Sequence, residues 1–179
     1  DFDLALAKIA EKDPNSQIIM IQTKFKFHLE SLKKRWFKNF PRLVDKVLFL
    51  ESMSLEKFLS LIKISDVLLD PFYFGSGLSF AESMIYGTPT ITMPTTFMRS
   101  RVATGIYKQM NIINAPIASD VNHFIELAIK LAKDKNSNNI LRENLKNAAK
   151  LYLFNNLESV KKFENFLLEV HEREKKRSN

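Results

Sequence analysis

The 179 residues suffice for one domain with a buried core, and 45% apolar with 26% charged residues is typical of a soluble globular chain. No apolar run approaches the roughly 18 residues of a membrane span, and the lack of Cys excludes disulfides and thiolate metal sites and favours a reducing cytoplasm. The net charge of +7 is spread over helical faces, so we expect no nucleic-acid site but a field that attracts an anionic small substrate.

Short apolar runs alternate with amphipathic segments along most of the chain, which is the pattern of a parallel sheet covered by helices. In chain order the residues predict an opening helix that Asp13-Pro14 ends, strand 17–22, helix 25–40, strand 46–50, helix 55–65, strand 66–71, helix 77–87, strand 88–94, helix 99–110 and a last short strand within 111–116. Helices at 121–134, 138–151 and 156–175 follow. We therefore predict a doubly wound α/β fold with helices on both faces of the sheet and a helical C-terminus.

Local signals mark several helix ends. Pro41 stops the helix before it, Ser54 is a plausible N-cap, and Gly87 lies just past the end of its helix. The chain begins at Asp1, without Met and inside a helical pattern. We therefore expect residues 1–179 to be a single lobe from a longer protein, with an α/β core over 1–118 and C-terminal helices over 119–179.

Glycine is concentrated after the expected strand 66–71, where the joint reads Pro-Phe-Tyr-Phe-Gly-Ser-Gly. Ligands of parallel α/β sheets bind at the carboxyl ends of strands, and the first amides of a helix attract phosphate. Gly75 and Gly77 let a ligand approach the backbone, Ser76 and Ser79 add hydroxyls, and Glu82 lies one turn further on, where a carboxylate can accept from ribose hydroxyls. The alternative is a turn with a structural role alone, because neither a dinucleotide fingerprint nor a P-loop is present.

Other polar residues are assigned structural roles. We expect His28, His123 and His171 to lie at the surface, and Asp70 to be a turn residue rather than a catalytic base. One of Arg99 and Arg101 is expected to meet a phosphate or an acidic partner, the alternative being a salt bridge to a neighbouring loop. Trp36 and most Phe residues are expected in the core, whereas the stretch 72–74 either lines a ligand pocket or packs beneath it.

The ordered set of motifs around this joint resembles the C-terminal lobe of the O-GlcNAc transferase family, with its SPINDLY-like and bacterial relatives. The motifs are Leu69-Asp70, Gly75 to Gly77, Glu82, Gly87-Thr88-Pro89, Met93-Pro94 and Arg101-Val102. The likeness covers most of residues 1–133. It implies the Rossmann-like C-terminal lobe of a two-lobed glycosyltransferase of the GT-B type, which binds a nucleotide-sugar donor.

By position, the resemblance implies Met53 and Phe58 at the base, Gly75, Ser76, Gly77, Leu78 and Ser79 at the diphosphate, and Glu82 at the ribose. Arg101, a cation at the start of a helix, is added to the expected donor contacts. It implies inverting, metal-independent transfer of a hexose or N-acetylhexosamine from a UDP-sugar, with protein Ser/Thr as an acceptor and no cofactor beside the donor substrate.

The sequence departs from the family pattern at three points. Relatives often have two polar residues where this chain has Leu78-Ser79, and Gly-Glu where it has Thr95-Thr96. The phosphate-binding Lys, the first strand of the lobe and the acceptor lobe have no counterpart in residues 1–179. We therefore expect these residues alone to be inactive and to bind donor weakly or fold poorly. The alternative function is a non-catalytic nucleotide- or phosphate-ligand-binding or interaction module.

Overall fold

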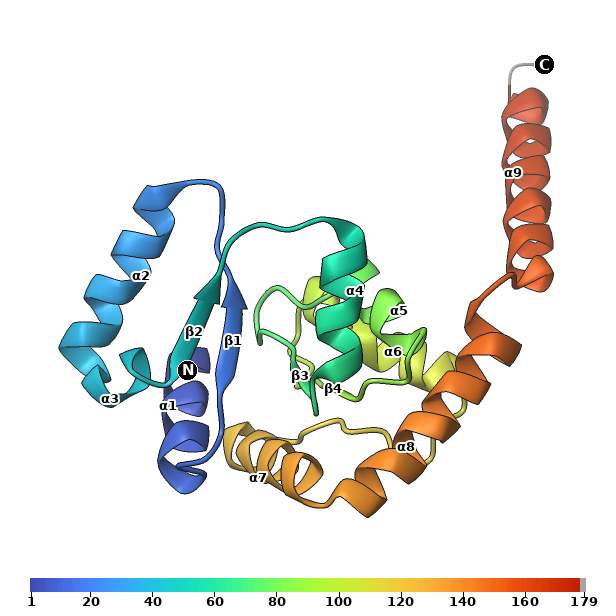
Figure 1. Cartoon of the computed structure of the whole chain (residues 1–179). Helices are drawn as coiled ribbons and strands as arrows, with labels where there is room; N and C mark the ends of the chain where they lie inside the picture. Colours follow the sequence, from blue (N-terminus) through green and yellow to red (C-terminus); the bar gives the residue numbers. More distant parts are fainter. Residues whose placement is uncertain (178–179) are drawn as a thin grey trace.

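The computed structural model describes residues 1–177, which form short parallel strand pairs surrounded by helices (Figure 1). The elements are α1 (Phe2–Lys12), β1 (Ile18–Ile21), α2 (Lys26–Asn39), α3 (Pro41–Val44), β2 (Val47–Leu50), α4 (Leu55–Ile64), β3 (Leu68–Leu69), α5 (Leu78–Met84), β4 (Thr90–Ile91), the 3-10 helix η1 (Met98–Ser100), α6 (Val102–Gln109), α7 (Val121–Lys133), α8 (Lys135–Ala148), the π-helix η2 (Ala149–Leu153) and α9 (Leu157–Arg177). The predicted α/β class, the alternating order and the helical C-terminus are confirmed.

The sheet is divided, which the sequence did not predict. β1 pairs in parallel with β2, and β3 pairs in parallel with β4, but the two pairs are separate two-stranded sheets among the described residues. The strands expected at 66–71 and 88–94 shrink to two residues each. The short strand expected within 111–116 is wrong: the next parallel contact is a single bridge between Thr92 and Ile117.

α1 joins the cores beneath the two strand pairs. Its Ala5 and Ile9 belong to a cluster with residues of β4 and α7, whereas Leu6 and Ala10 belong to a second cluster with β1, β2 and the buried Trp36. A third cluster lies between α5, α6 and the end of α8. The expectation that most Phe residues are buried is only partly correct, since several are exposed: Phe25, Phe27, Phe37, Phe74, Phe97, Phe163 and Phe166.

The predicted helix ends are confirmed by their hydrogen bonds. The side chain of Ser54 accepts from the N–H of Lys57 and caps α4. After α5, the N–H of Thr88 donates to the carbonyl of Ser83 at 3.0 Å, and Gly87 adopts a φ of 65°. This is a Schellman termination, which explains the glycine there.

The helices after α7 lead away from the strands. α8 begins at Lys135, earlier than expected, because the carboxylate of Asp134 accepts from the N–H of Ser137 and caps it. α9 buries none of its residues and extends away from the rest of the molecule (Figure 1). Within residues 1–177, no helix combines the length and the apolar content that crossing a membrane requires.

We expect Tyr107→Phe to lower the free energy of unfolding by about 1–3 kcal/mol, because it leaves buried backbone groups without partners. The Tyr107 hydroxyl donates to the carbonyl of Thr90 at 2.9 Å and accepts from its N–H at 3.0 Å, which ties α6 to β4. Burial raises the pKa of Tyr107 well above its usual range, so this hydroxyl stays protonated. Urea unfolding measures the change. Tyr86→Phe is the control, because the Tyr86 hydroxyl has no hydrogen bond among the described residues, and an equal loss there would contradict the assignment.

Candidate functional site

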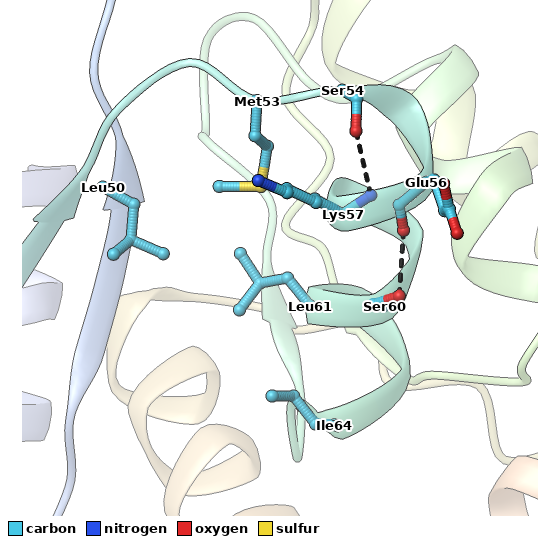
Figure 2. A pocket seen from close by; sticks show the side chains of 8 residues that line it. All are labelled: Leu50, Met53, Ser54, Glu56, Lys57, Ser60, Leu61 and Ile64. Carbon is cyan, nitrogen blue, oxygen red and sulfur yellow. Dashed lines mark hydrogen bonds between the residues drawn. The ribbon is translucent and has the colours of Figure 1, made fainter.

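A cavity of about 520 Å³ lies between the end of β2 and one face of α4 (Figure 2). Its lining is Leu50, Met53, Ser54, Glu56, Lys57, Ser60, Leu61 and Ile64. Leu50 lies on the β2 side and Leu61 and Ile64 on the α4 side, and the side chain of Lys57 extends toward Met53 (Figure 2). The Lys57 ammonium has no ion pair within residues 1–177. Met53, which the sequence assigns to the base, lines this cavity. Phe58, assigned to the base as well, is half-buried and does not line it.

The turn after β3 is held from inside by Asp70. This residue is buried, and its carboxylate accepts from the N–H of Ser76 at 2.6 Å and from the hydroxyl of Thr92 at 2.8 Å. A Cβ on Gly75 would lie 3.0 Å from one oxygen of the same carboxylate, so glycine allows the close approach. Asp70 is therefore a turn residue, as the sequence predicts.

The backbone N–H groups that remain available to a ligand lie further along the chain than the sequence predicts. The N–H of Gly75 donates to the carbonyl of Arg99 at 3.0 Å, and that of Ser76 is taken by Asp70, so both point inward. Within the described residues, the N–H groups of Gly77, Leu78 and Ser79 have no internal partner. A Cβ on Gly77 would meet no atom within 4 Å, so the protein's own packing does not require this glycine. Of the residues assigned to the diphosphate, these three can still offer amides.

The charged residues near the turn differ in how they are engaged. Arg99 donates through Nε to the carbonyl of Tyr73 at 2.8 Å and stacks on Phe97, so it braces the neighbouring loop. Arg101, at the start of α6, is exposed, and its guanidinium has no hydrogen bond or ion pair within residues 1–177. The carboxylate of Glu82, half-buried on α5, is likewise unpaired in the described chain. Because α4 and α5 pack against each other, the cavity at α4 and Glu82 of α5 lie on neighbouring helices.

The family model described as glycosyl transferase family 41 matches residues 4–163, a range that contains every residue assigned to the donor site. The chain belongs to glycosyltransferase family 41. The family expected from the motifs is thus confirmed.

Among solved structures, a point mutant of Thermobaculum terrenum O-GlcNAc transferase matches this family 41 chain with a TM-score of 0.76 and 19% sequence identity. The match covers 97% of this chain and 33% of the other, so the chain spans about a third of the length of that protein. At this identity the likeness concerns the fold. A comparison with curated proteins gives no match.

Two features of the cavity and the turn after β3 could not be decided from the sequence. Lys57 was not predicted as a site residue, although its place in the first turn of α4, close to Met53, was a usable signal. In the aromatic stretch, Phe72 is buried against Phe2 and Phe124 and packs beneath the turn, whereas Phe74 is exposed. Phe72 therefore has a packing role, whereas Phe74 is accessible to a ligand.

Proposed function

We propose that this family 41 chain binds a UDP-sugar and serves as the donor lobe of an inverting, metal-independent glycosyltransferase. The proposed reaction transfers a hexose or N-acetylhexosamine to a Ser or Thr hydroxyl of a protein. The observation that carries the proposal is the family match over residues 4–163, combined with an open cavity at Met53 beside unpaired amides on the adjoining helix. Cytoplasmic location belongs to the same proposal and rests on the lack of Cys.

In this proposal the base occupies the cavity, with the backbone of Met53 as its polar contact and Leu61 as part of the apolar wall. The diphosphate lies at the amides of Gly77 to Ser79, and the carboxylate of Glu82 accepts from the ribose hydroxyls. Amide donors fixed before the reaction stabilise the negative charge that develops on the leaving UDP. The chain supplies no base for the acceptor in this proposal, so residues 1–179 alone are expected to bind donor without transferring sugar.

We expect Glu82→Ala to weaken binding of the preferred nucleotide by about 1–3 kcal/mol, or roughly 5-fold to 150-fold, because a charged acceptor for two hydroxyls is lost. Titrations with UDP, GDP and ADP measure the effect, and UDP is expected to bind best. Glu143→Ala is the matched control, since Glu143 is exposed on α8, outside the candidate site. An unchanged affinity for Glu82→Ala would remove this residue from the site.

In the proposal the Lys57 ammonium reaches from the wall of the base cavity toward the diphosphate. We therefore expect Lys57→Met to weaken UDP binding about threefold while leaving uridine binding unaffected, since a partly screened charge contributes up to about 1 kcal/mol. Met preserves the apolar stem that covers the cavity, so the difference between the two ligands isolates the ammonium. Calorimetric titration of both ligands provides the measurement. Equal losses for UDP and uridine would place Lys57 at the base instead of the phosphates.

A further inference from the structure

α2 is held to the β1–β2 pair by one of its faces. Trp36 is fully buried in a cluster with Ile18 of β1 and Val47 of β2, and Leu32, one turn earlier, packs against the same cluster. The other residues of α2 are half-buried or exposed, and the helix lies at the outside of the molecule (Figure 1). The side of α2 opposite Trp36 is therefore open to solvent.

This open side carries two large rings beside two lysines. At about 100° of rotation per residue, Phe27, Lys34 and Lys38 point directly away from Trp36, and Phe37 flanks them. We call Phe27, Lys34, Phe37 and Lys38 the outer face of α2. The two rings are 71% and 70% exposed. One exposed ring is ordinary on a protein surface, whereas two on one helix face form an apolar patch that favours a partner.

Two basic residues of α2 are engaged by the protein itself. Arg35 forms an ion pair with Asp3 at 2.7 Å, and the Lys33 ammonium lies 4.7 Å from the centre of the Phe49 ring. These contacts tie the flanks of α2 to α1 and to β2. They are not available to a partner, so any binding by charge depends on the other lysines.

The remaining lysines of α2 have no counter-charge. Lys26, Lys34 and Lys38 form no hydrogen bond or ion pair within residues 1–177. Glu30, the one acidic residue of α2, lies one turn from Lys26 and Lys34 and pairs with neither in the described chain. The outer face thus combines uncompensated positive charge with exposed rings.

α9 also exposes apolar residues but differs in charge. It contains five acidic and six basic residues, and ion pairs such as that between Lys162 and Glu158 at 2.7 Å join them within the helix. Opposite charges so close together cancel beyond a short distance, so α9 does not favour an anionic surface. The excess of unpaired lysines beside exposed rings distinguishes α2.

We propose that the outer face of α2 docks on an anionic lipid surface, with Phe27 and Phe37 between the headgroups and Lys34 and Lys38 against their phosphates and carboxylates. Aromatic rings flanked by lysines are typical of helices that lie in the membrane interface. The two rings are about 15 Å apart along the helix axis, so a helix lying flat brings both to the same layer. The inference does not depend on the nucleotide or the sugar.

The shape and the type of the basic residues favour lipid over an acidic polypeptide. The rings project from the convex surface of a helix, where a fluid layer can surround each of them, whereas a folded partner needs matching pockets. Lysine is a compact charge that suits a diffuse anionic surface, while paired recognition of single carboxylates favours arginine. With two rings and few charges, the binding is expected to be weak and reversible.

The first test is co-sedimentation of the 179-residue chain with vesicles made of equal parts of phosphatidylserine and phosphatidylcholine. We expect binding at least roughly tenfold stronger than to phosphatidylcholine alone, and a decrease as salt is added, because salt screens the lysines. Equal binding to both kinds of vesicle would overturn the proposal.

Charge variants locate the contact, because a net charge of +7 attracts the chain to any anionic vesicle. Lys34→Gln combined with Lys38→Gln is expected to weaken binding tenfold or more, at roughly fivefold for each basic residue at the surface. Lys108→Gln combined with Lys150→Gln removes the same charge from exposed positions on α6 and η2, and a change below about twofold is expected. Equal losses in the two double variants would show that net charge alone acts, and would overturn the proposal.

The rings are tested without a change of charge. Phe27→Ser combined with Phe37→Ser is expected to weaken vesicle binding at least roughly tenfold, because the apolar contact with the lipid is lost. Both side chains are exposed, so urea unfolding is expected to stay close to that of the unchanged chain. Undiminished binding would show that the rings do not enter the lipid and would overturn the proposal.

Glu30→Gln gives a change in the opposite direction. It removes the one acidic residue of α2, so vesicle binding is expected to strengthen about threefold to fivefold. A gain of binding cannot result from a folding defect. Unchanged or weaker binding of this variant would contradict a contact through α2.

A soluble polyanion separates lipid from an acidic polypeptide partner. Polyglutamate, at the same concentration of anionic groups as the vesicles, is expected to displace little of the bound chain, because it offers no apolar layer to Phe27 and Phe37. Displacement as complete as that by an excess of competing vesicles would assign the outer face to an acidic polypeptide and overturn the proposal.

Discussion

Gly87→Ala is expected to destabilise the protein by about 2–5 kcal/mol, the sum of a left-handed backbone strain and an overpacking term. Gly87 has a φ of 65°, a region that residues with a Cβ adopt only with strain. A Cβ at this position would lie 2.0 Å from the backbone carbonyl oxygen of Arg142 on α8, which is far inside van der Waals contact. Both effects act in the same direction.

The clash at Gly87 cannot be relieved by a small shift of α8. The Arg142 guanidinium donates to Asn138 at 2.8 Å, to the hydroxyl of Thr88 at 3.1 Å and to carbonyls of the segment that joins α4 to β3, including that of Ser65. The bond to Asn138 lies within α8, but moving α8 away would break the bonds to Thr88 and to the segment that joins α4 to β3, and Arg142 would lose acceptors that compensate its partial burial.

Urea unfolding of Gly87→Ala and Gly105→Ala makes a matched comparison. Gly105 lies inside α6, and a Cβ there would meet no atom within 4 Å. Ala at this position is therefore expected to raise stability by about 0.5–1 kcal/mol through helix propensity. Opposite signs for the two substitutions are the predicted result. Two changes of the same sign would show that the contact with Arg142 does not determine the outcome.

The sequence predicted those features that depend on neighbouring residues. Ser54 and Gly87 were placed correctly, because a helix cap is set by the few residues around it. The order of strands and helices also follows from local periodicity. The division of the sheet into the pairs β1-β2 and β3-β4 could not be predicted this way, because periodicity carries no information on which strands pair.

The candidate site shows the same limit. The glycines after β3 were identified from composition, but which amides remain free depends on Asp70, whose carboxylate takes the N–H of Ser76. The bond between Arg99 and the carbonyl of Tyr73 joins residues 26 positions apart, and it commits Arg99 to the loop while Arg101 stays unpaired within residues 1–177. Such long-range contacts decide the roles of residues that look equivalent in the sequence. The division into an α/β core over 1–118 and helices over 119–179 stays a prediction.

Asp70→Ala is expected to lower the free energy of unfolding by about 2–4 kcal/mol, because it leaves the N–H of Ser76 and the hydroxyl of Thr92 without their buried acceptor. We also expect it to loosen the turn that sets the direction of the Gly77 amide. UDP binding is then weakened by more than the increased fraction of unfolded protein explains. Urea unfolding measures the loss of stability, and a UDP titration without urea measures the loss of affinity, so the two effects are separated.

Asp70→Asn provides the decisive comparison for this turn. The amide oxygen of Asn can still accept from Ser76, and its NH₂ can donate to the hydroxyl of Thr92, so the geometry of the turn is expected to survive with a smaller loss of stability. The NMR shift of the Ser76 amide proton should stay near its original value in Asp70→Asn and move in Asp70→Ala. If both variants bound UDP as tightly as the unchanged chain, Asp70 would be limited to the core, and the turn would owe its shape to the contact between Gly75 and Arg99.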